Sequence, residues 1–433
     1  MPVSYAQFSL RLRHEKLSTP KMIKLLGKYA VYYPVVMAHV WVIGAMYYFF
    51  KWEFRRANTP PHPEHGYPPI SILLPCHNEG DNVRETVAWL QKQDYPNFDI
   101  IAINDGSRDN TGEILDELSL ASTQLRIIHL AKNQGKATGL RMGALLSKSE
   151  YLVCIDGDAL LEPDACRWMV NHFIDSPRVG AVTGNPRIRN RSSLLGKIQV
   201  GEFSCIIGMI KRAQRIYGRI FSVSGVIVAF RKQALHDVGY WSTDMMTEDV
   251  DITWKLQRGR WDIRYEPSAK CWVLMPETIN GLWKQRLRWA QGGMQVLSKN
   301  VGLLFHWSER HMWVLVLEAL ASVAWVYTLA ALTIILLVST ITGGWEQVLA
   351  SPAEWGTVSI EITLTCLTQF ACGFFLDSRY EKGIWRYYFW MIWYPVVYWM
   401  LNAAATFVGL PKALLNRNRG LATWVSPDRG LKP

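Results

Sequence analysis

The most informative local pattern in this chain is Tyr151-Leu152-Val153-Cys154-Ile155-Asp156-Gly157-Asp158. A short apolar run that ends at a turn is typical of a buried strand. Asp156 and Asp158 are suited to a divalent cation, because a hard cation that bridges phosphates takes one or two carboxylates and keeps its waters. Asp and Gly also favour ordinary turns, so the stretch alone supports a metal site and a turn equally.

Upstream of this stretch, short apolar runs alternate with helical patterns back to Ile70. The predicted strands are Ile70–Leu74, Ile100–Ile103 and Leu125–His129, and the predicted helices are Asn82–Lys92, Thr111–Leu118 and Lys136–Leu146. Alternation of this kind predicts an α/β fold, with a mostly parallel sheet covered by helices on both faces. Ligands bind beyond the carboxyl ends of such strands, so the polar residues there are the candidates for function.

Two candidates follow predicted strands. Asp105 stands in Asn104-Asp105-Gly106-Ser107, which taken alone favours a turn over a binding site. Lys136 begins a predicted helix and is placed to meet a phosphate or a base, although the surrounding residues do not form a P-loop. Taken alone, a solvated helix lysine is the more ordinary interpretation of Lys136.

Two further clusters lie downstream. In Thr247-Glu248-Asp249 a carboxylate is available to take a proton from a sugar hydroxyl, while helix capping by Thr247 is an equal alternative. Gln285, Arg288 and Trp289 fall at helical spacing. Arginine matches diphosphate oxygens and an indole offers a platform for a sugar ring, but a belt of Trp and Arg at a membrane surface has the same composition.

The composition indicates a membrane protein with a large water-soluble part. Hydrophobic residues make up 49% of the chain, with 20 Trp, yet the mean hydropathy is only +0.02. The net charge of +11 is better explained by basic flanks of membrane helices than by nucleic-acid binding, since no nucleic-acid-binding module is recognisable. Seven cysteines without a C-x-x-C pair argue against a disulfide framework and a zinc site.

Val31–Phe50 is nearly free of charge and predicts one spanning helix, with an aromatic and basic anchor at its end. Leu282–Phe305 predicts amphipathic helices at the membrane surface. Three further apolar runs are long enough to span, namely Trp313–Ile341, Val358–Leu376 and Tyr387–Leu410.

We therefore divide the chain into a basic N-terminal segment (1–30), a membrane helix (31–52), a linker (53–69), the α/β domain (70–275), amphipathic interface helices (276–310), about three membrane helices (311–411) and a C-terminal tail (412–433). This division places the basic N-terminus and the basic tail on the side of the membrane opposite the α/β domain, against the positive-inside tendency. An interfacial or re-entrant segment at each end would remove the conflict.

The order of these motifs, from an Asp and an Asp-x-Asp to Thr-Glu-Asp and Gln-x-x-Arg-Trp before membrane helices, resembles the processive family-2 glycosyltransferases, which include cellulose, chitin and hyaluronan synthases. The resemblance covers Ile70 to Trp289 and the helices that follow. It is closer still to the bacterial poly-β-1,6-N-acetylglucosamine synthases, in Asp156–Leu161, Val182–Arg187, Lys197–Glu202 and Trp424–Gly430. One departure is the basic, weakly apolar stretch that stands where those proteins have a first hydrophobic segment.

The resemblance implies a GT-A-like fold with a nucleotide-sugar site. On the donor side, it implies that Asp105 meets the uridine, that Lys136 lies near the nucleotide, and that Asp156 and Asp158 hold a metal, Mg²⁺ or Mn²⁺, on the diphosphate. Asp249 is implied to be the general base, with Glu248 beside it. The remaining implied roles are contact with the leaving diphosphate for Gln285 and Arg288 and stacking under the acceptor sugar for Trp289.

The implied activity is an inverting, metal-dependent glycosyltransferase that polymerises N-acetylglucosamine from UDP-N-acetylglucosamine into a β-1,6-linked biofilm exopolysaccharide and moves it across the bacterial inner membrane. The catalytic domain would be cytoplasmic. Implied partners are membrane lipid, a small membrane subunit and regulation by cyclic di-GMP through the complex, and no nucleic acid. The alternatives are transfer of one sugar to a polyprenyl-phosphate carrier and a membrane component that keeps the fold without the activity.

Overall fold

The computed structural model describes residues 19–64, 66–342, 352–415 and 420–423. The basic residues before Thr19 and the predicted motif Trp424–Gly430 lie outside the described residues.

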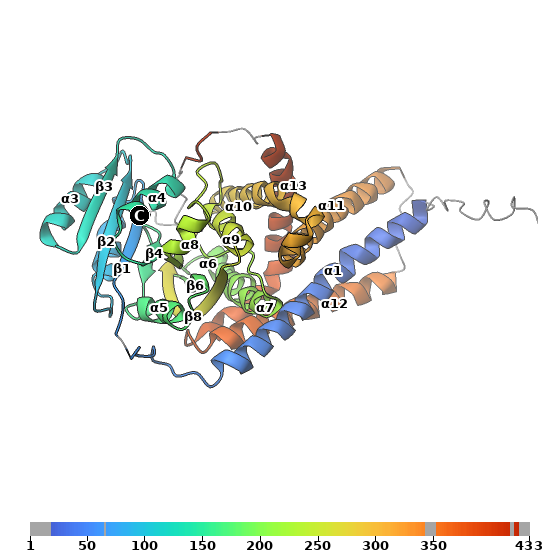
Figure 1. The fold of residues 1–433 in the computed structure, drawn as a ribbon. Coiled ribbons are helices and arrows are strands. Elements are labelled where there is room, and N and C mark those ends of the chain that lie inside the picture. The colour runs from blue at the N-terminus through green and yellow to red at the C-terminus, as the bar shows by residue number, and fades with distance from the viewer. Residues whose placement is uncertain (1–18, 65, 343–351, 416–419, 424–433) are drawn as a thin grey trace, which may run out of the picture.

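An eight-stranded sheet forms the centre of the larger part of the molecule, in the order β3-β2-β1-β4-β7-β6-β8-β5 (Figure 1). Its strands are β1 (Ile70–Cys76), β2 (Phe98–Asp105), β3 (Leu125–Leu130), β4 (Tyr151–Ile155), β5 (Leu160–Leu161), β6 (Val179–Ile188), β7 (Ile227–Arg231) and β8 (Asp262–Val273). β1 pairs in parallel with β2 and β4, as do β2 with β3 and β6 with β8, while the remaining pairings are antiparallel. The predicted mostly parallel α/β sheet is therefore confirmed.

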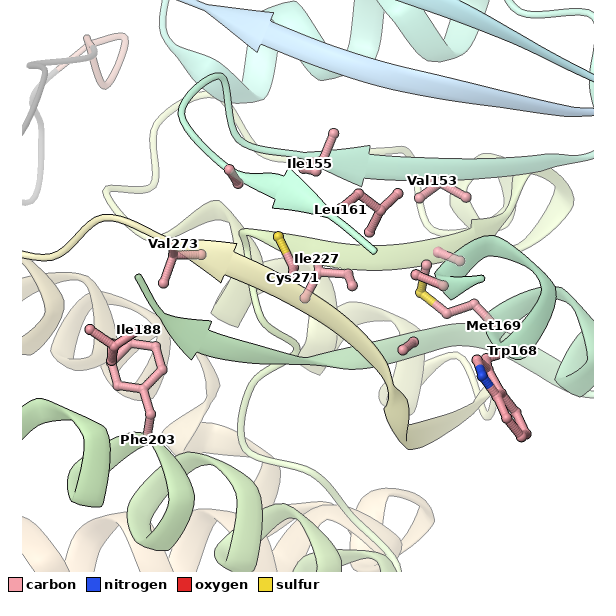
Figure 2. Packing of buried hydrophobic residues seen from close by; sticks show 14 of the residues in the cluster. Val153, Ile155, Leu161, Trp168, Met169, Ile188, Phe203, Ile227, Cys271 and Val273 are labelled. Carbon is pink, nitrogen blue, oxygen red and sulfur yellow. The ribbon is translucent and has the colours of Figure 1, made fainter. Parts of the chain in front are cut away.

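Helices cover both faces of this sheet. The helices of this part of the chain are α2 (Val83–Leu90), α3 (Thr111–Ala121), α4 (Lys136–Leu146), α5 (Ala165–Ile174), α6 (Leu194–Glu202), α7 (Ile210–Tyr217), α8 (Lys232–Asp237), α9 (Glu248–Arg258) and α10 (Ile279–Asn300), of which α10 packs mainly on α13. Side chains alternate between faces along a strand, so Ile72 enters the cluster beneath α2, α3 and α5, while Leu73 enters the cluster beneath α4. Figure 2 shows part of the first cluster, with Val153 and Ile227 of the sheet near Met169 of α5.

The first of these clusters continues from the sheet into the membrane helices. It includes Ile188 of β6 and Phe203, which begins the π-helix Phe203–Met209, as well as Phe370 and Phe374 of α12 (Pro352–Asp377). The sheet and the membrane helices are therefore packed against each other through one apolar core.

Three helices in the described part of the chain are long and apolar enough to cross a membrane. These spans are Lys21–Glu53, which overlaps α1 (Thr19–Tyr48), Trp307–Ile341, which contains α11 (Trp313–Ile341), and Val358–Asp377 of α12. Side chains such as Leu337 and Ile360 are exposed on them, as expected of surfaces that face lipid.

The predicted spanning helix over Tyr387–Leu410 is not among the spans found in the described residues. This run is divided into a 3₁₀-helix (Ile384–Trp393), a π-helix (Tyr394–Tyr398) and α13 (Trp399–Leu415), none of which is among the described spans. Instead, α13 packs along α10 (Figure 1). Hydropathy identifies this run as apolar, but it does not distinguish a helix that faces lipid from one that is packed on protein.

The position of the described tail agrees with two spans after the sheet. The backbone N–H of Ala422 donates to the carbonyl of Thr243 at 2.9 Å, so the chain has returned to the sheet domain. An even number of crossings has this effect, whereas the predicted three would leave the tail on the opposite side. The single helix α1 still places the N-terminal end opposite the sheet domain.

A network of buried ion pairs, here called the membrane-side network, joins the sheet domain to the ends of two spans. Arg212 of α7 pairs with Glu53 at 2.7 Å and with Asp377 at 3.0 Å. Asp377 also pairs with Arg187 of β6, which in turn pairs with Glu381 at 2.7 Å. Arg187, Arg212 and Asp377 are at most 1% exposed, so this network is removed from water.

Candidate active site

The predicted acidic residues gather at one edge of the sheet. Asp105 is the last residue of β2, and Asp156 and Asp158 follow β4 directly. Asp105 is fully buried, and its two carboxylate oxygens accept the backbone N–H groups of Gln134 and Gly135 at 2.7 and 2.8 Å. Asp105 thereby holds the loop from which α4 and Lys136 begin, in addition to any contact with a nucleotide.

Lys136 is at the centre of the site, so its interpretation as a solvated helix lysine is wrong. Its Nζ lies 2.5 Å from Asp156 Oδ1 and 3.1 Å from Glu248 Oε1, and it donates to the carbonyl of Gly225 at 3.0 Å. Burial alone would lower the pKa of Lys136, but Asp156 and Glu248 outweigh it and raise the pKa above its usual value. Lys136 therefore stays charged and joins the end of β4 to the start of α9.

Asp249 lies in the first turn of α9, next to Glu248. Thr247 precedes this helix, but its side chain makes no capping hydrogen bond and its buried hydroxyl oxygen has no hydrogen-bond partner among the described residues. The alternative in which Thr247 caps the helix is therefore wrong. The carboxylate of Asp249 accepts the N–H of Val250 at 2.9 Å.

The surroundings of Asp249 raise its pKa to about 6. Burial is the largest cause, and the Glu248 carboxylate adds to it, while Lys136, the Val250 N–H and Arg288 oppose the rise. A small cavity behind the two carboxylates is lined by apolar side chains, including Leu140, Val228 and Phe230. A carboxyl group with a pKa of about 6 is largely ionised at neutral pH and still basic enough to take a proton.

α10 brings the Gln-x-x-Arg-Trp motif over the start of α9. A Cβ on Gly292 would lie 2.3 Å from the side chain of Thr247, so only glycine permits this approach. Gly292 follows Arg288 by one helical turn, and Arg288 is close enough to Asp249 to lower its pKa. The structure thus brings Arg288 and Asp249, 39 positions apart in the sequence, to the same site.

The two arginines of this motif differ. Arg286 is buried, pairs with Glu202 of α6 at 2.6 Å, and lies 4.3 Å from the centre of the Trp289 ring. Arg288 is exposed and has no ion-pair partner within the described ranges. Arg288 is therefore the arginine that remains available to an anionic ligand, while Arg286 supports Trp289.

Gln285 is buried and has an oxygen that needs a partner. Its Oε1 atom makes no hydrogen bond to any described residue, and its amide nitrogen lies 3.9 Å from the sulfur of Met275. A buried carbonyl oxygen without a donor costs free energy, and such atoms often face a ligand.

The turn Ser224-Gly225 was not among the sequence candidates, although it contacts the centre of the site. Its Gly225 carbonyl accepts from Lys136, and a Cβ at Gly225 would lie only 3.1 Å from Asp249 Oδ2. A Ser-Gly dipeptide carries no chemical signature of its own, so no sequence signal marked it.

No group of three or more His, Cys, Asp or Glu side chains in the described part of the chain is arranged to hold a metal ion by itself. The Asp156 and Asp158 carboxylates nevertheless interact, and Asp158 raises the pKa of Asp156, after burial and against Lys136. Two neighbouring carboxylates at a strand end are what a cation shared with a diphosphate requires, because the phosphates and water complete its coordination.

Comparison with known proteins agrees with this architecture. The family model described as "Glycosyltransferase like family 2" matches residues 68–292. Poly-beta-1,6-N-acetyl-D-glucosamine synthase of Staphylococcus epidermidis is 42% identical over 404 residues, which cover 93% of this chain and 98% of the relative. The synthase of Staphylococcus aureus strain MSSA476 is 40% identical with the same coverage.

A solved structure with the same fold is the mannosyltransferase PcManGT of Pyrobaculum calidifontis, with a TM-score of 0.62 and 18% identity over 89% of this chain and 99% of that chain. The sheet, the helices on both faces and the family match together make this a GT-A-type domain. The chain is a glycosyltransferase that belongs to family 2 and, within it, to the family of the poly-β-1,6-N-acetyl-D-glucosamine synthases.

Proposed function

We propose that this chain polymerises N-acetylglucosamine from UDP-N-acetylglucosamine into a β-1,6-linked exopolysaccharide. The observation that carries the proposal is the arrangement of Asp249 beside Lys136 and Arg288, in a chain that matches the staphylococcal synthases over nearly their whole length. The names of these relatives support the sugar and the linkage.

Asp249 is the proposed general base. Its carboxylate takes the proton of the acceptor 6-hydroxyl as that oxygen attacks the anomeric carbon of the donor. The C–O bond to the acceptor forms while the bond to the diphosphate breaks, and UDP leaves with the electron pair. One displacement inverts the α-linked donor to a β-linked product. Glu248 keeps Lys136 in place next to this base.

The leaving diphosphate is proposed to meet Arg288 and Gln285 from α10. Arg288 has no carboxylate partner among the described residues, and Gln285 has no donor for its buried oxygen. Asp105 and Lys136 are proposed on the nucleotide side, where Asp105 orders the loop that carries Lys136. These groups supply hydrogen bonds and charge where the departing UDP becomes more negative.

Asp156 and Asp158 are proposed to hold Mg²⁺ or Mn²⁺ on the diphosphate. When bound, such an ion neutralises charge on the leaving group. The mannosyltransferase PcManGT, which shares the fold, was solved with GDP-mannose and Mn²⁺. In this chain Lys136 contacts Asp156 and would adjust as the two carboxylates take up the ion.

Trp289 is proposed as the platform for the acceptor sugar, since its ring is partly exposed and is supported by Arg286. We place the catalytic domain on the cytoplasmic side of a bacterial inner membrane, with the polymer moved across that membrane. A small membrane subunit and regulation by cyclic di-GMP remain predictions from the family.

The test uses membranes that contain the full chain, with and without candidate partner subunits, supplied with Mg²⁺ and either UDP-N-acetylglucosamine or UDP-glucose. UDP release and product length are measured. We expect polymer from UDP-N-acetylglucosamine and a loss of at least about 100-fold in Asp249→Asn, the lower end of what a positioned base contributes. Asp251→Asn is the matched control, because Asp251 lies on the same helix but bonds Ser242 and Lys299 instead of facing the site.

Either of two results would overturn the proposal. A one-sugar lipid product would indicate transfer to a carrier lipid, and polymer from UDP-glucose alone would change the donor. Full activity in the Asp249→Asn variant would exclude Asp249 as the general base.

A further inference from the structure

Lys211 of α7 is a buried amine next to the site that the mechanism above does not use. It is 7% exposed, and its Nζ donates to Thr183 Oγ1 of β6 at 3.2 Å. Within the described residues, no carboxylate lies within ion-pair distance of this nitrogen. Its neighbour Arg212, by contrast, is paired with both Glu53 and Asp377. Lys211 and Arg212 therefore differ, because only Arg212 is part of the ion-pair network that joins the sheet domain to the spans.

Thr183 links Lys211 to the turn that contacts the base. The same Oγ1 atom accepts the backbone N–H of Ser224 at 2.8 Å. The next residue, Gly225, accepts from Lys136 through its carbonyl and lies so close to Asp249 that a Cβ there would be 3.1 Å from Oδ2. A movement of the Ser224-Gly225 turn would therefore move Lys136 and Asp249 with respect to each other.

The charge of Lys211 also acts on this site. Burial lowers the pKa of Lys211 to about 7, and the Asp249 carboxylate opposes that fall. Asp249 in turn faces Glu248 on its own helix, Lys136 of α4 and Arg288 of α10. On its other side, the Lys211 nitrogen lies 6.0 Å from the centre of the Tyr265 ring of β8.

We propose that Lys211 is a positioning residue for the transfer reaction, which through Thr183 holds the Ser224-Gly225 turn against Asp249. This inference rests on the proposed function, in which Asp249 is the base. The amine does little for the fold itself, because an ammonium buried with one neutral partner costs free energy that methionine at the same place would not. We therefore explain the buried position of the Lys211 amine by its effect on Asp249.

The experiment compares Lys211→Met with Thr183→Val and Thr183→Ser in the full chain in membranes. In Lys211→Met we expect kcat to fall by about 10-fold or more, with KM for the donor within about 2-fold, because the reaction step loses support while donor binding does not. The acid limb of the pH profile should move to higher pH, since a positive charge opposite Asp249 is lost. The midpoint of thermal unfolding should not fall.

The two Thr183 variants test the hydrogen-bonded link from Lys211 through Thr183 to the Ser224-Gly225 turn. Thr183→Val removes the shared acceptor and should lower kcat in the same direction, whereas Thr183→Ser keeps the hydroxyl and should restore it. If Lys211→Met loses stability together with activity, or keeps both kcat and the acid limb, the inference is wrong.

A readout independent of the donor separates this inference from the proposed function. The difference in thermal stability between wild type and Asp249→Asn, followed against pH, reports the titration of Asp249. Its midpoint should move to higher pH when Lys211→Met is present in both proteins, and an unchanged midpoint would contradict the inference. Lack of polymer from UDP-N-acetylglucosamine in the wild type would overturn the proposed function alone.

Discussion

The membrane-side network and the active site are both clusters of charged side chains, fully buried in the first and partly buried in the second, and they are built differently. In the network, Arg212 and Arg187 each have two carboxylate partners, and these partners are buried with them. In the active site, Lys136 alone pairs with Asp156 and Glu248, while Asp249 beside them has no cation within ion-pair distance among the described residues. The network is nearly balanced, whereas the site has an excess of carboxylates.

This difference indicates that the membrane-side network stabilises the fold and that the active site is arranged for chemistry. A buried ion pair whose members satisfy each other gives fixed geometry, and removal of one member is costly. An excess of carboxylates raises the pKa of Asp249 and leaves room for cations and phosphates that the ligand brings. The network joins two spans to the sheet, whereas the proposed active site keeps an excess of carboxylates that a bound ligand and cation could balance.

The largest expected effect on stability comes from breaking the network. Arg212→Met leaves the buried Glu53 without its arginine and Asp377 with Arg187 alone, and should lower the free energy of unfolding by about 3–5 kcal/mol. Asp249→Asn removes a charge that the fold disfavours and should leave stability unchanged or raise it. Unfolding of the purified proteins in detergent measures both.

Arg84→Gln is the control for this comparison, since Arg84 pairs with Glu117 on the surface and its removal should have no measurable effect. Equal losses of stability in Arg212→Met and Asp249→Asn would show that the two clusters do not differ as described.

The second expected effect is a pH dependence with opposite signs for activity and stability. The pKa of Asp249 is raised from its usual 3.8 to about 6, so activity should rise with pH through about 6 as the base ionises. The stability that protonated Asp249 contributes is fully present below about pH 4 and is lost as pH rises through about 6. Initial rates and thermal unfolding over pH 4.5–8 measure the two limbs.

Asp249→Asn should abolish the part of the pH dependence of stability that comes from the titration of Asp249. A rate profile that is flat through pH 6 at saturating donor would contradict the assignment of Asp249 as the titrating base.

The smallest effect is expected at Trp289. Arg286→Lys keeps a charge for Glu202 but loses the planar guanidinium that lies over the indole. We expect shorter product chains and a several-fold loss of polymer at low acceptor concentration, with the KM for the donor unchanged. Product length by gel filtration checks this, and an increase in donor KM alone would place Arg286 on the donor side instead.

The first half of the sheet was predictable because its elements are marked locally. β4 and α4 begin and end where the apolar run and the helical pattern predict. The second half is harder to recognise, because β6 contains Gly180, Gly184 and Pro186 and β8 alternates with polar residues. Among the site residues, Asp156 and Asp158 were visible as a motif, whereas the roles of Lys211 and Gly225 depend on neighbours that are distant in the sequence.

Local sequence patterns were enough to identify the strands of the first half of the sheet, the acidic motifs that follow them and the runs that are apolar enough for a membrane, since these depend on neighbours a few positions apart. Tertiary structure decided that Lys136 lies between two carboxylates, that Thr247 does not cap α9 and that α13 packs on α10. Burial and pairing with distant residues set the charge and the pKa of each group, and no local pattern carries that information.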